Sequence, residues 1–592
     1  MNNLLHKLRS IFLSPNSAFE LTLRTIYHKI VATRIFFHFH NHLAKRSYRK
    51  YRSNQQKNAL PHLGAIPNKP TVTFLLSYSA VELTDVRATL QSIQSLHGDR
   101  WEVLLVTAVE IPDTNLSETK DSRIKLVRSD HPDLLNLITG EYVIFCDAGD
   151  QFSTALLWHF YKTLSDHPTA DLVYYDCEYD HNQTGELKPF FKPDALSPAL
   201  LLSVNYFSRG FIRCDALQSM WTEVASYPDL LCLEYDIALR LCEISKTIRH
   251  ISNLLIQQTR LVTPSRPEIQ NIIEMYLARQ GLRAVSSSQK ITGCRFSWAS
   301  DDPSLAIVIP SKDNRTYLEP LVHSLLNQPY HGPITIHIID NGSNDPATIA
   351  YYQTIQNNKS NISIIPYDKS FNYSEAINLG VFSSKSDLVL LLNDDMALID
   401  QDTLPELVQW AIRPEVGVVG AKLLRANHTI QHAGIILGLR EFMGHIYLNA
   451  PEHYNGLFGC VDWYRNYLAL TGACQMFRRE VFDKVGGYDP GYQLAFGDID
   501  FCIKVYEEGY QNIYTPFAQI FHYEGSSRGY HTPVTDVLRG YDQLEKYMVE
   551  GDPFFSPNLT HTSIPKCVIK NRSHDERQEQ IAARKRFYIK KP

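Results

Sequence analysis

An apolar strand runs directly into acidic residues at Asp387-Leu-Val-Leu-Leu-Leu-Asn393-Asp394-Asp395-Met396. A strand this apolar is buried on both faces, which is typical of an open α/β sheet with parallel strands. Such sheets bind their ligands at the carboxyl ends of the strands, where these carboxylates lie. Oxygen ligands at that position suit a hard divalent cation. The stretch therefore predicts both a fold class and a ligand site.

An altered copy of this stretch lies about 240 residues earlier, at Glu141-Tyr-Val-Ile-Phe-Cys146-Asp147-Ala148-Gly149-Asp150. Strand and helix patterns alternate around both copies, which predicts an α/β fold with mostly parallel sheets covered by helices. The expected strands lie at 72–77, 101–106 and 142–145 in the first half and at 305–309, 334–339 and 388–392 in the second. We expect a duplication of whole domains, because solenoid repeats are much shorter.

The chain has 592 residues, too many for a single hydrophobic core. We expect a basic helical segment at 1–70, a domain at 71–265, a helical linker at 266–303, a second domain at 304–550 and a tail at 551–592. The tail is polar and ends in basic residues, so we expect it to be flexible. The composition, 44% hydrophobic and 20% charged, is that of an ordinary globular protein.

Positive charge is concentrated at the start of the chain. Residues 1–70 hold twelve Lys and Arg and one acid, Glu20, which gives +11; the rest is −16, by subtraction from the net charge of −5. A basic amphipathic helix here either lies on an anionic membrane surface or packs on the protein's own domains with a solvated basic face. Amphipathicity alone leaves both alternatives open. We expect no nucleic acid partner.

The ten cysteines are well separated and form no Cys-x-x-Cys pair, which is typical of reduced cytoplasmic thiols. No apolar run is long enough for a membrane-spanning helix. Lys7, Arg9 and Pro15 interrupt any signal-peptide core. We therefore expect a cytoplasmic protein. A more specific hypothesis is that it lies peripherally on the inner face of the cytoplasmic membrane.

Four elements of the second half carry candidate chemistry. Asp340 follows a strand and is suited either to a nucleotide contact or to capping the turn Asn341-Gly342-Ser343. The acid cluster Asn393-Asp394-Asp395 suits Mg²⁺ or Mn²⁺. Asp498 suits either a helix N-cap or a general base. His522 and Arg528, on a Gly/Ser-rich stretch, suit a metal and phosphate site.

Taken together, these motifs resemble those of bacterial glycosyltransferase family 2, which has the GT-A fold. The resemblance covers roughly 240 residues of the second half. It is carried by Ala306-Ile-Val-Ile-Pro-Ser-Lys-Asp313-Asn314, Phe371-Asn372-Tyr-Ser-Glu-Ala376-Ile-Asn378, Asn393-Asp394-Asp395, Thr471-Gly472-Ala473-Cys474, Gly486-Gly487-Tyr488-Asp489 and Gly497-Asp498-Ile499-Asp500. The further stretches Gln431-His432-Ala433-Gly434 and Ser527-Arg528-Gly529 resemble the two-domain branch linked to O-antigen or rhamnan synthesis.

The resemblance implies inverting sugar transfer from a nucleotide-diphospho-sugar to a glycan or lipid-linked oligosaccharide acceptor. It implies Asp498 as the base, and Asp395 and His522 as ligands of Mg²⁺ or Mn²⁺. The nucleotide-sugar contacts that it implies are Pro310, Asp313, Asp340, Asn378, Asn393, Asp394 and Arg528.

The first half resembles the partner domain of the same branch but lacks its working residues. Thr107 or a neighbour stands where the family has its nucleotide-binding Asp, and Gly149 stands where it has its metal-binding Asp. Glu234 stands where the family has its catalytic base, and Gln257 or Gln258 stands where it has its metal-binding His near the end of the domain. Too few metal ligands remain to hold a cation, so we expect this half not to transfer sugar.

Two other functions remain open from the sequence. The first is a catalytically retired protein that binds glycans or acts as a scaffold in a polysaccharide assembly complex. The second is a glycoside hydrolase with paired carboxylates, which needs no metal. The sequence names neither the sugar nor the linkage, because the side chains that read sugar hydroxyls lie on variable loops. Trp463, Tyr464 and Tyr467 suit either acceptor stacking or the core.

Overall fold

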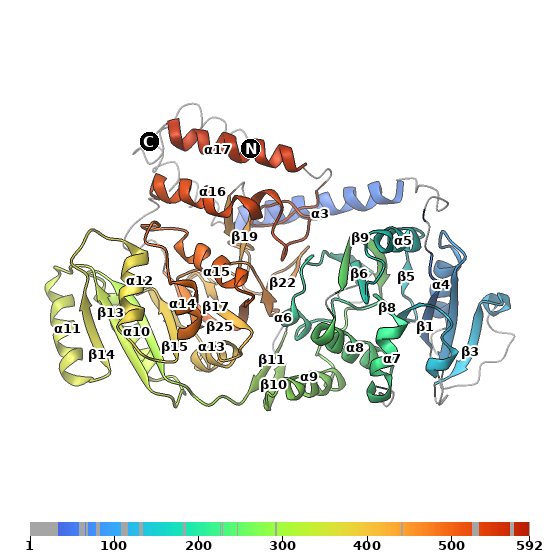
Figure 1. Cartoon of the computed structure of the whole chain (residues 1–592), viewed down its shortest axis with the longest axis horizontal. Helices are drawn as coiled ribbons and strands as arrows, with labels where there is room; N and C mark the ends of the chain where they lie inside the picture. Colours follow the sequence, from blue (N-terminus) through green and yellow to red (C-terminus); the bar gives the residue numbers. More distant parts are fainter. Residues whose placement is uncertain are drawn as a thin grey trace.

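The computed structural model describes residues 34–57, 66, 69–78, 83–107, 117–129, 134–180, 185–224, 227, 229–245, 247–289, 293–439, 442–523, 532–568 and 573–590. It contains two large mixed sheets, each covered by helices (Figure 1). The predicted α/β class is confirmed. Both sheets are parallel over their first four strands and mixed beyond them.

The first sheet has the order β3-β2-β1-β4-β8-β6-β9-β5, with β7 beside β6. Its strands are β1 (Val72–Tyr78), β2 (Trp101–Thr107), β3 (Ile124–Arg128), β4 (Tyr142–Asp147), β5 (Gln151–Phe152), β6 (Leu172–Asp180), β7 (Leu187–Phe190), β8 (Phe211–Arg213) and β9 (Ile248–Gln258). Its helices are α4 (Leu83–Gln94), α5 (Leu156–Asp166), α6 (Pro198–Leu201), α7 (Cys214–Val224) and α8 (Leu230–Ile244). Two 3-10 turns, Ser117–Lys120 and Leu134–Leu137, complete this half.

The second sheet has the order β14-β13-β12-β15-β24-β17-β25-β16. Its strands are β12 (Leu305–Ser311), β13 (Ile334–Asp340), β14 (Ile362–Pro366), β15 (Leu388–Leu392), β16 (Met396–Leu398), β17 (Val416–Leu424), β24 (Cys474–Arg478) and β25 (Gln511–His522), with β18 (Ile430–His432) and β23 (Arg465–Asn466) at its margin. Each position holds the strand that corresponds in chain order to the strand of the first sheet, so the predicted duplication is confirmed at the level of topology.

Helices and small hairpins complete the second half. The helices are α10 (Arg315–Leu326), α11 (Pro346–Asn358), α12 (Tyr373–Phe382), α13 (Thr403–Ala411), α14 (Arg479–Val485), α15 (Gly497–Glu507) and α16 (Val534–Val549). The hairpin strands are β19 (Ile435–Leu437), β20 (Met443–His445), β21 (Asn455–Gly456) and β22 (Gly459–Cys460). Local sequence sets several ends: Asp345 and Asn372 cap α11 and α12, and Gly486 ends α14 in the left-handed conformation.

The two halves share one continuous hydrophobic core. The Asn466 carboxamide oxygen accepts hydrogen bonds from the Ser197 hydroxyl at 3.0 Å and the Ala199 amide at 3.1 Å across the junction. The rings of Phe190 and Trp463 meet edge to face at 5.3 Å. Trp463, Tyr464 and Tyr467 are all buried, so core packing is the alternative that the structure supports for them.

Helix α3 (Arg34–Lys57) lies across both halves (Figure 1). Its Phe37 ring contacts Tyr454 of the second half, and its Tyr51 ring contacts Phe191 of the first. Arg52 Nε pairs with Glu178 Oε1 at 2.9 Å. For residues 34–57 the structure therefore supports packing on the protein's own domains, with Arg46, Arg49 and Lys50 exposed. Residues 1–33 of the predicted basic segment lie outside the described residues.

The linker and the tail differ from expectation. Linker helix α9 (Pro267–Arg279) is followed by a hairpin, β10 (Ala284–Gln289) and β11 (Cys294–Trp298), which packs on α13 through Arg295 and Glu406. The expectation of a flexible tail is wrong for residues 551–568, because apolar side chains interrupt the polar sequence and are buried. These are Phe554, Phe555, Leu559, Ile564 and Cys567. Helix α17 (His574–Lys590) then packs along α16.

All ten cysteines lie within the described residues and are free thiols. Among the helices described, none is long and apolar enough to cross a membrane.

An ion cluster, in which the His250 and Asp176 side chains are buried and Asp194 is exposed, ties the tail to the first half. His250 Nδ1 lies 2.6 Å from Asp194 Oδ1, and His250 Nε2 lies 3.0 Å from Asp176 Oδ1. Asp176 Oδ2 also accepts a hydrogen bond from Asn558 at 2.9 Å. Burial lowers the pKa of His250, but the two carboxylates outweigh burial and raise that pKa to about 9.

We expect this cluster to make folding stability depend on pH. The folded pKa of His250 lies above its unfolded value of about 6.5, so its contribution is complete below pH 6.5 and is lost as pH rises through 9. The loss is about 3 kcal/mol at 1.36 kcal/mol per pKa unit. Urea denaturation should show that the wild type has the larger free energy of unfolding below pH 6.5, and that its advantage over His250→Gln shrinks by about 3 kcal/mol as the pH rises to 9. The exposed control His331→Gln should track the wild type, and a constant gap for His250→Gln would contradict the assignment.

Candidate active site

Backbone pairing brings the acid cluster of β15 beside the turn that precedes β24. Leu392 pairs with Cys474, and the Asn393 amide donates to the Ala473 carbonyl at 3.1 Å. On the other side, Met396 of β16 pairs with His522 of β25. The cluster therefore lies between two segments that are distant in sequence.

Asp395 and His522 face one another in this arrangement. Asp395 Oδ1 lies 3.3 Å from His522 Nε2, and both residues are largely buried. The side-chain nitrogen Nδ2 of Asn393 lies 3.4 Å from the same imidazole nitrogen, Nε2 of His522. Within the described ranges, His522 Nδ1 is buried without a hydrogen-bond partner. The structure therefore brings together the two side chains predicted to hold a metal.

Asp394 is the second carboxylate of the pair. Burial raises its pKa to about 6; the Ser311 hydroxyl, which donates to Oδ2 at 2.8 Å, lowers the pKa, and the Asp395 charge raises it. Two adjacent, mostly buried carboxylates favour a bound cation, which would keep both ionised.

Asp498 is the second residue of α15, and its carboxylate points at the turn before β24. Its Oδ2 accepts from the Gly472 amide at 2.7 Å, and its Oδ1 accepts from the Ile499 amide at 3.0 Å. A Cβ at position 472 would lie 2.9 Å from Asp498 Cβ, so only glycine fits there without a shift. Because Ala473 also holds Asn393, one turn positions both Asp498 and the acid cluster.

Asp340, at the end of β13, caps its own turn. Its Oδ1 accepts from the Ser343 amide at 3.1 Å and from the Ser343 hydroxyl at 2.5 Å. Asp313, after β12, accepts the amides of Asn344 and Asp345 at 2.6 and 2.8 Å. The structure thus joins the loops that follow β12 and β13, and shows the turn-capping alternative for Asp340. A nucleotide contact by either residue stays a prediction, as it does for Pro310 in β12.

Asn378 on α12 clamps the backbone of Tyr488. Its Nδ2 donates to the Tyr488 carbonyl at 2.8 Å, and its Oδ1 accepts the Tyr488 amide at 3.0 Å. This side chain therefore positions the Gly486-Gly487-Tyr488 turn; a direct contact with a nucleotide-sugar stays a prediction. Arg528 lies outside the described residues.

Sequence reasoning assigned no role to two further histidines. His432 Nδ1 lies 2.9 Å from His445 Nδ1. Burial lowers the pKa of His432 well below its ordinary value, and His445 and His522 lower it further. The His432 ring is thus a neutral neighbour of the acid-cluster histidine. The sequence signal that could have pointed to His432 is the motif Gln431-His432-Ala433-Gly434.

The first half builds the same site with different residues. Tyr78 pairs with Thr107 as Ser311 pairs with Asp340, so Thr107 occupies the Asp340 position. Phe152 pairs with Ile256 as Leu398 pairs with Ile520, so Gln258, two residues after Ile256, occupies the position of His522.

Gly149 stands at the position of Asp395, as expected. Tyr142 to Phe152 and Leu388 to Leu398 both span eleven residues, and Phe152 pairs with Ile256 as Leu398 pairs with Ile520, so the two turns have the same length. The Asp150 carboxylate follows one residue later, at the position of Met396.

An internal arginine engages that carboxylate. Arg209 is fully buried, and its Nε lies 2.6 Å from Asp150 Oδ2 while its Nη1 lies 3.1 Å from Glu234 Oε2. The Arg209 amide also donates to Glu234, as the Gly472 amide donates to Asp498. Glu234 thus holds the Asp498 position, and a guanidinium lies between the two acids.

Comparison with known proteins gives one family match. Residues 306–486 match the family described as Glycosyl transferase family 2. The matched range begins in β12, includes the acid cluster and the Gly472 turn, and ends before Asp498 and His522.

Two curated relatives match most of this chain. A protein of Sinorhizobium fredii described as uncharacterized protein y4gI is 30% identical over 75% of this chain and 50% of its own length. The O-antigen biosynthesis protein RfbC of Myxococcus xanthus is 30% identical over 88% of this chain and 42% of its own length. The chain thus spans half or less of the length of these two relatives.

Shorter similarities reach one further relative and two solved structures. The N-acetylglucosaminyl-diphospho-decaprenol L-rhamnosyltransferase of Mycobacterium tuberculosis is 24% identical over 33% of this chain and 69% of its own length. The mannosyltransferase PcManGT from Pyrobaculum calidifontis, solved with GDP-Man and Mn²⁺, covers 42% of this chain and 70% of its own, with 15% identity and a TM-score of 0.30. The similarity to GalNAc-T7, solved with UDP, GalNAc and Mn²⁺, covers 48% of this chain and 58% of the GalNAc-T7 chain, with 15% identity and a TM-score of 0.35.

Proposed function

We propose that this chain, whose residues 306–486 belong to glycosyl transferase family 2, transfers a sugar from a nucleotide-diphospho-sugar to a glycan acceptor during polysaccharide synthesis. The observation that carries the proposal is the shared turn Gly472–Ala473, which holds Asp498 and the Asn393–Asp395 cluster side by side. Transfer needs a base beside a diphosphate site, and this turn supports both.

Asp498 is the proposed base of an inverting reaction. It removes the proton of an acceptor hydroxyl while that oxygen attacks the anomeric carbon, and the bond from this carbon to the diphosphate oxygen breaks on the opposite face. The amides of Gly472 and Ile499 fix the orientation of the carboxylate before the acceptor arrives. Preorganisation of this kind avoids a reorganisation cost during the reaction.

The residues present fit a divalent cation. Asp395 offers an oxygen and His522 a nitrogen 3.3 Å apart, a mixed set that suits Mn²⁺ better than Mg²⁺. No group of three or more His, Cys, Asp or Glu side chains within the described ranges is arranged to hold a metal, so the donor diphosphate and water would complete the shell. A cation bound there would offset the charge that develops on the departing diphosphate.

We expect Mn²⁺ to stabilise the protein through these two side chains. A ligand at one hundred times its dissociation constant adds about 2.7 kcal/mol to the free energy of unfolding. Thermal denaturation with Mn²⁺ and UDP should show a raised Tm for the wild type, and little rise for Asp395→Asn or His522→Ala. The exposed controls Asp301→Asn and His323→Ala should behave as the wild type. An undiminished rise in the Asp395 and His522 variants would sink the metal assignment.

We expect Asp498→Asn to reduce turnover by roughly 10²–10⁴-fold while donor binding persists, because the amide keeps its shape but cannot take a proton. A panel of nucleotide sugars, screened for release of nucleoside diphosphate, would first identify the donor. The same assay then compares Asp498→Asn with the control Asp301→Asn. Near-normal turnover by Asp498→Asn would rule out its role as base.

The first half is proposed not to transfer sugar. Gln258 and Thr107 stand where the second half has His522 and Asp340. Arg209 supplies internally the positive charge that a cation would supply, and it fills the space between Asp150 and Glu234. The Asp150 carboxylate therefore stabilises the fold through Arg209 and is not available to a donor site.

We expect substitution of Arg209 to destabilise the first half. Removing the charges of its two acidic partners as well should restore the lost stability. Arg209→Met leaves two carboxylates buried without a cation and costs about 3–5 kcal/mol. Adding Asp150→Asn and Glu234→Gln should restore most of that loss in urea denaturation. A single variant as stable as the wild type would contradict the buried ion cluster.

The acceptor and the location are part of the proposal. The rhamnosyltransferase relative is named for a diphospho-decaprenol acceptor, which supports a lipid-linked oligosaccharide here and a peripheral place at the inner membrane face. Paired-carboxylate hydrolysis would survive EDTA, whereas the proposed transfer would not. Glycan binding without turnover of any nucleotide sugar would favour the scaffold alternative.

A further inference from the structure

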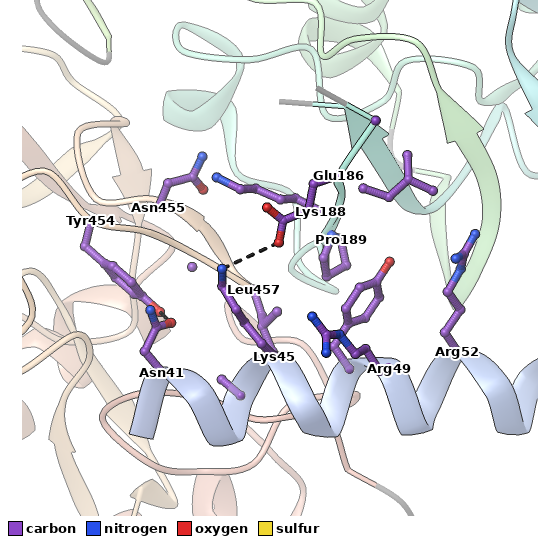
Figure 2. Close-up of a pocket in the computed structure, with 15 residues that line it drawn as sticks. Asn41, Lys45, Arg49, Arg52, Glu186, Lys188, Pro189, Tyr454, Asn455 and Leu457 are labelled. Atoms are coloured by element: carbon purple, nitrogen blue, oxygen red, sulfur yellow. Dashed lines mark hydrogen bonds and ion pairs between the residues drawn. The ribbon is translucent and has the colours of Figure 1, made fainter. Parts of the chain in front are cut away.

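A cavity of about 300 Å³ lies where α3 meets both halves of the protein (Figure 2). One wall is α3 from Asn41 to Arg52, the second is Gly185–Pro189 of the first half, and the third is Tyr454–Leu457 of the second. Its volume is at the lower end of the range for small-ligand sites. None of the lining residues belongs to the acid cluster or to the Asp498 turn.

The cavity carries more positive than negative charge. Its lining has four basic side chains, Lys45, Arg49, Arg52 and Lys188, and one acidic side chain, Glu186. Lys45 pairs with Glu186 at 3.5 Å, and Arg52 pairs with Glu178 at 2.9 Å.

The side chains of Arg49 and Lys188 make no hydrogen bond or ion pair with any other residue in the described part of the chain. Lys188 is half-buried: burial lowers the pKa of its ammonium group, the neighbouring Lys45 lowers it further, and Glu186 offsets part of this shift. A cation placed beside another cation and partly withdrawn from water is costly unless an anion binds to it.

The rest of the lining suits a sugar ring. Tyr48 and Tyr454 contribute aromatic rings, and Leu457 and Pro189 contribute apolar surface. The Asn455 carboxamide donates to Tyr179 at 3.2 Å, but its carbonyl oxygen is buried without a partner among the described residues. A buried carbonyl oxygen of this kind is satisfied by a hydroxyl donor. Figure 2 shows Asn455 and Lys188 directed toward the same region of the cavity.

We propose that this cavity binds one anionic saccharide unit, a sugar ring that carries a phosphate or a carboxylate. Arg49 and Lys188 contact the anion, and the Asn455 carbonyl oxygen accepts a ring hydroxyl. The saccharide part rests on the proposed function, whereas the anionic part rests on the lining charges alone. Such a site holds a glycan on the protein away from the point of transfer.

The test is calorimetric titration of the full chain with glucose 1-phosphate, glucuronate, inorganic phosphate and glucose. The decisive variant is Arg49→Gln with Lys188→Gln. The matched control is Arg46→Gln with Lys50→Gln, which removes the same charge from exposed positions of α3 outside the cavity. We expect glucose 1-phosphate or glucuronate to bind the wild type and the control, and to bind the cavity variant roughly tenfold or more weakly.

Three outcomes would overturn the proposal. The first is equal affinity of the two double variants for both anionic sugars. The second is inorganic phosphate binding as tightly as glucose 1-phosphate, because the ring would then contribute nothing. The third is loss of binding to phosphatidylglycerol vesicles in the cavity variant alone, with no binding of either sugar, which would assign the site to a lipid headgroup. The Asp498→Asn assay reports on the proposed transfer independently of these results.

Discussion

Carboxylates at the end of a buried strand must be compensated, and this constraint organises both halves of the protein. An acid pair withdrawn from water raises its own pKa, as Asp394 shows, unless positive charge lies nearby. The first half meets the constraint internally with the guanidinium of Arg209. The second half leaves the acids of the cluster facing a histidine, which suits an external cation. The same topology thus supports a closed ion cluster in one copy and an open ligand site in the other.

The junction between the halves is packed and hydrogen-bonded. Asn466 accepts hydrogen bonds from Ser197 and Ala199, and the Phe190–Trp463 contact continues the hydrophobic core through the junction. Helix α3 and residues 551–568 then cover the junction, through Tyr454 and through Asn558. A buried, specific junction of this kind makes the first half a permanent part of the structure on which the second half packs.

Much of the fold follows from local sequence, and much of the site does not. Apolar runs at Leu388–Leu392 and Val72–Tyr78 are enough to predict the strands, their class and their duplication. Residues 306–486 match the family that the motifs predicted. Spacing placed Gly149 at the position of Asp395, and the strand register agrees, because Phe152 lies opposite Ile256 as Leu398 lies opposite Ile520. Arg209 lies 59 residues from Asp150 and 25 from Glu234, so no local pattern could reveal their contact. For Asn378 the motif identified the residue, and the structure shows that it clamps Tyr488.

Helix α3 also has a consequence for how the molecule is assembled. It is translated before either sheet, yet its partners are Glu178, Phe191, Tyr454 and Cys567, the last of which is 520 residues away from its bonding partner Ser47. Domains fold as units in the order of synthesis, so both sheets must form before α3 has its full docking surface. This helix therefore completes its docking only after residues far later in the chain have been made. Until Cys567 has been synthesised, part of the surface that receives α3 does not exist.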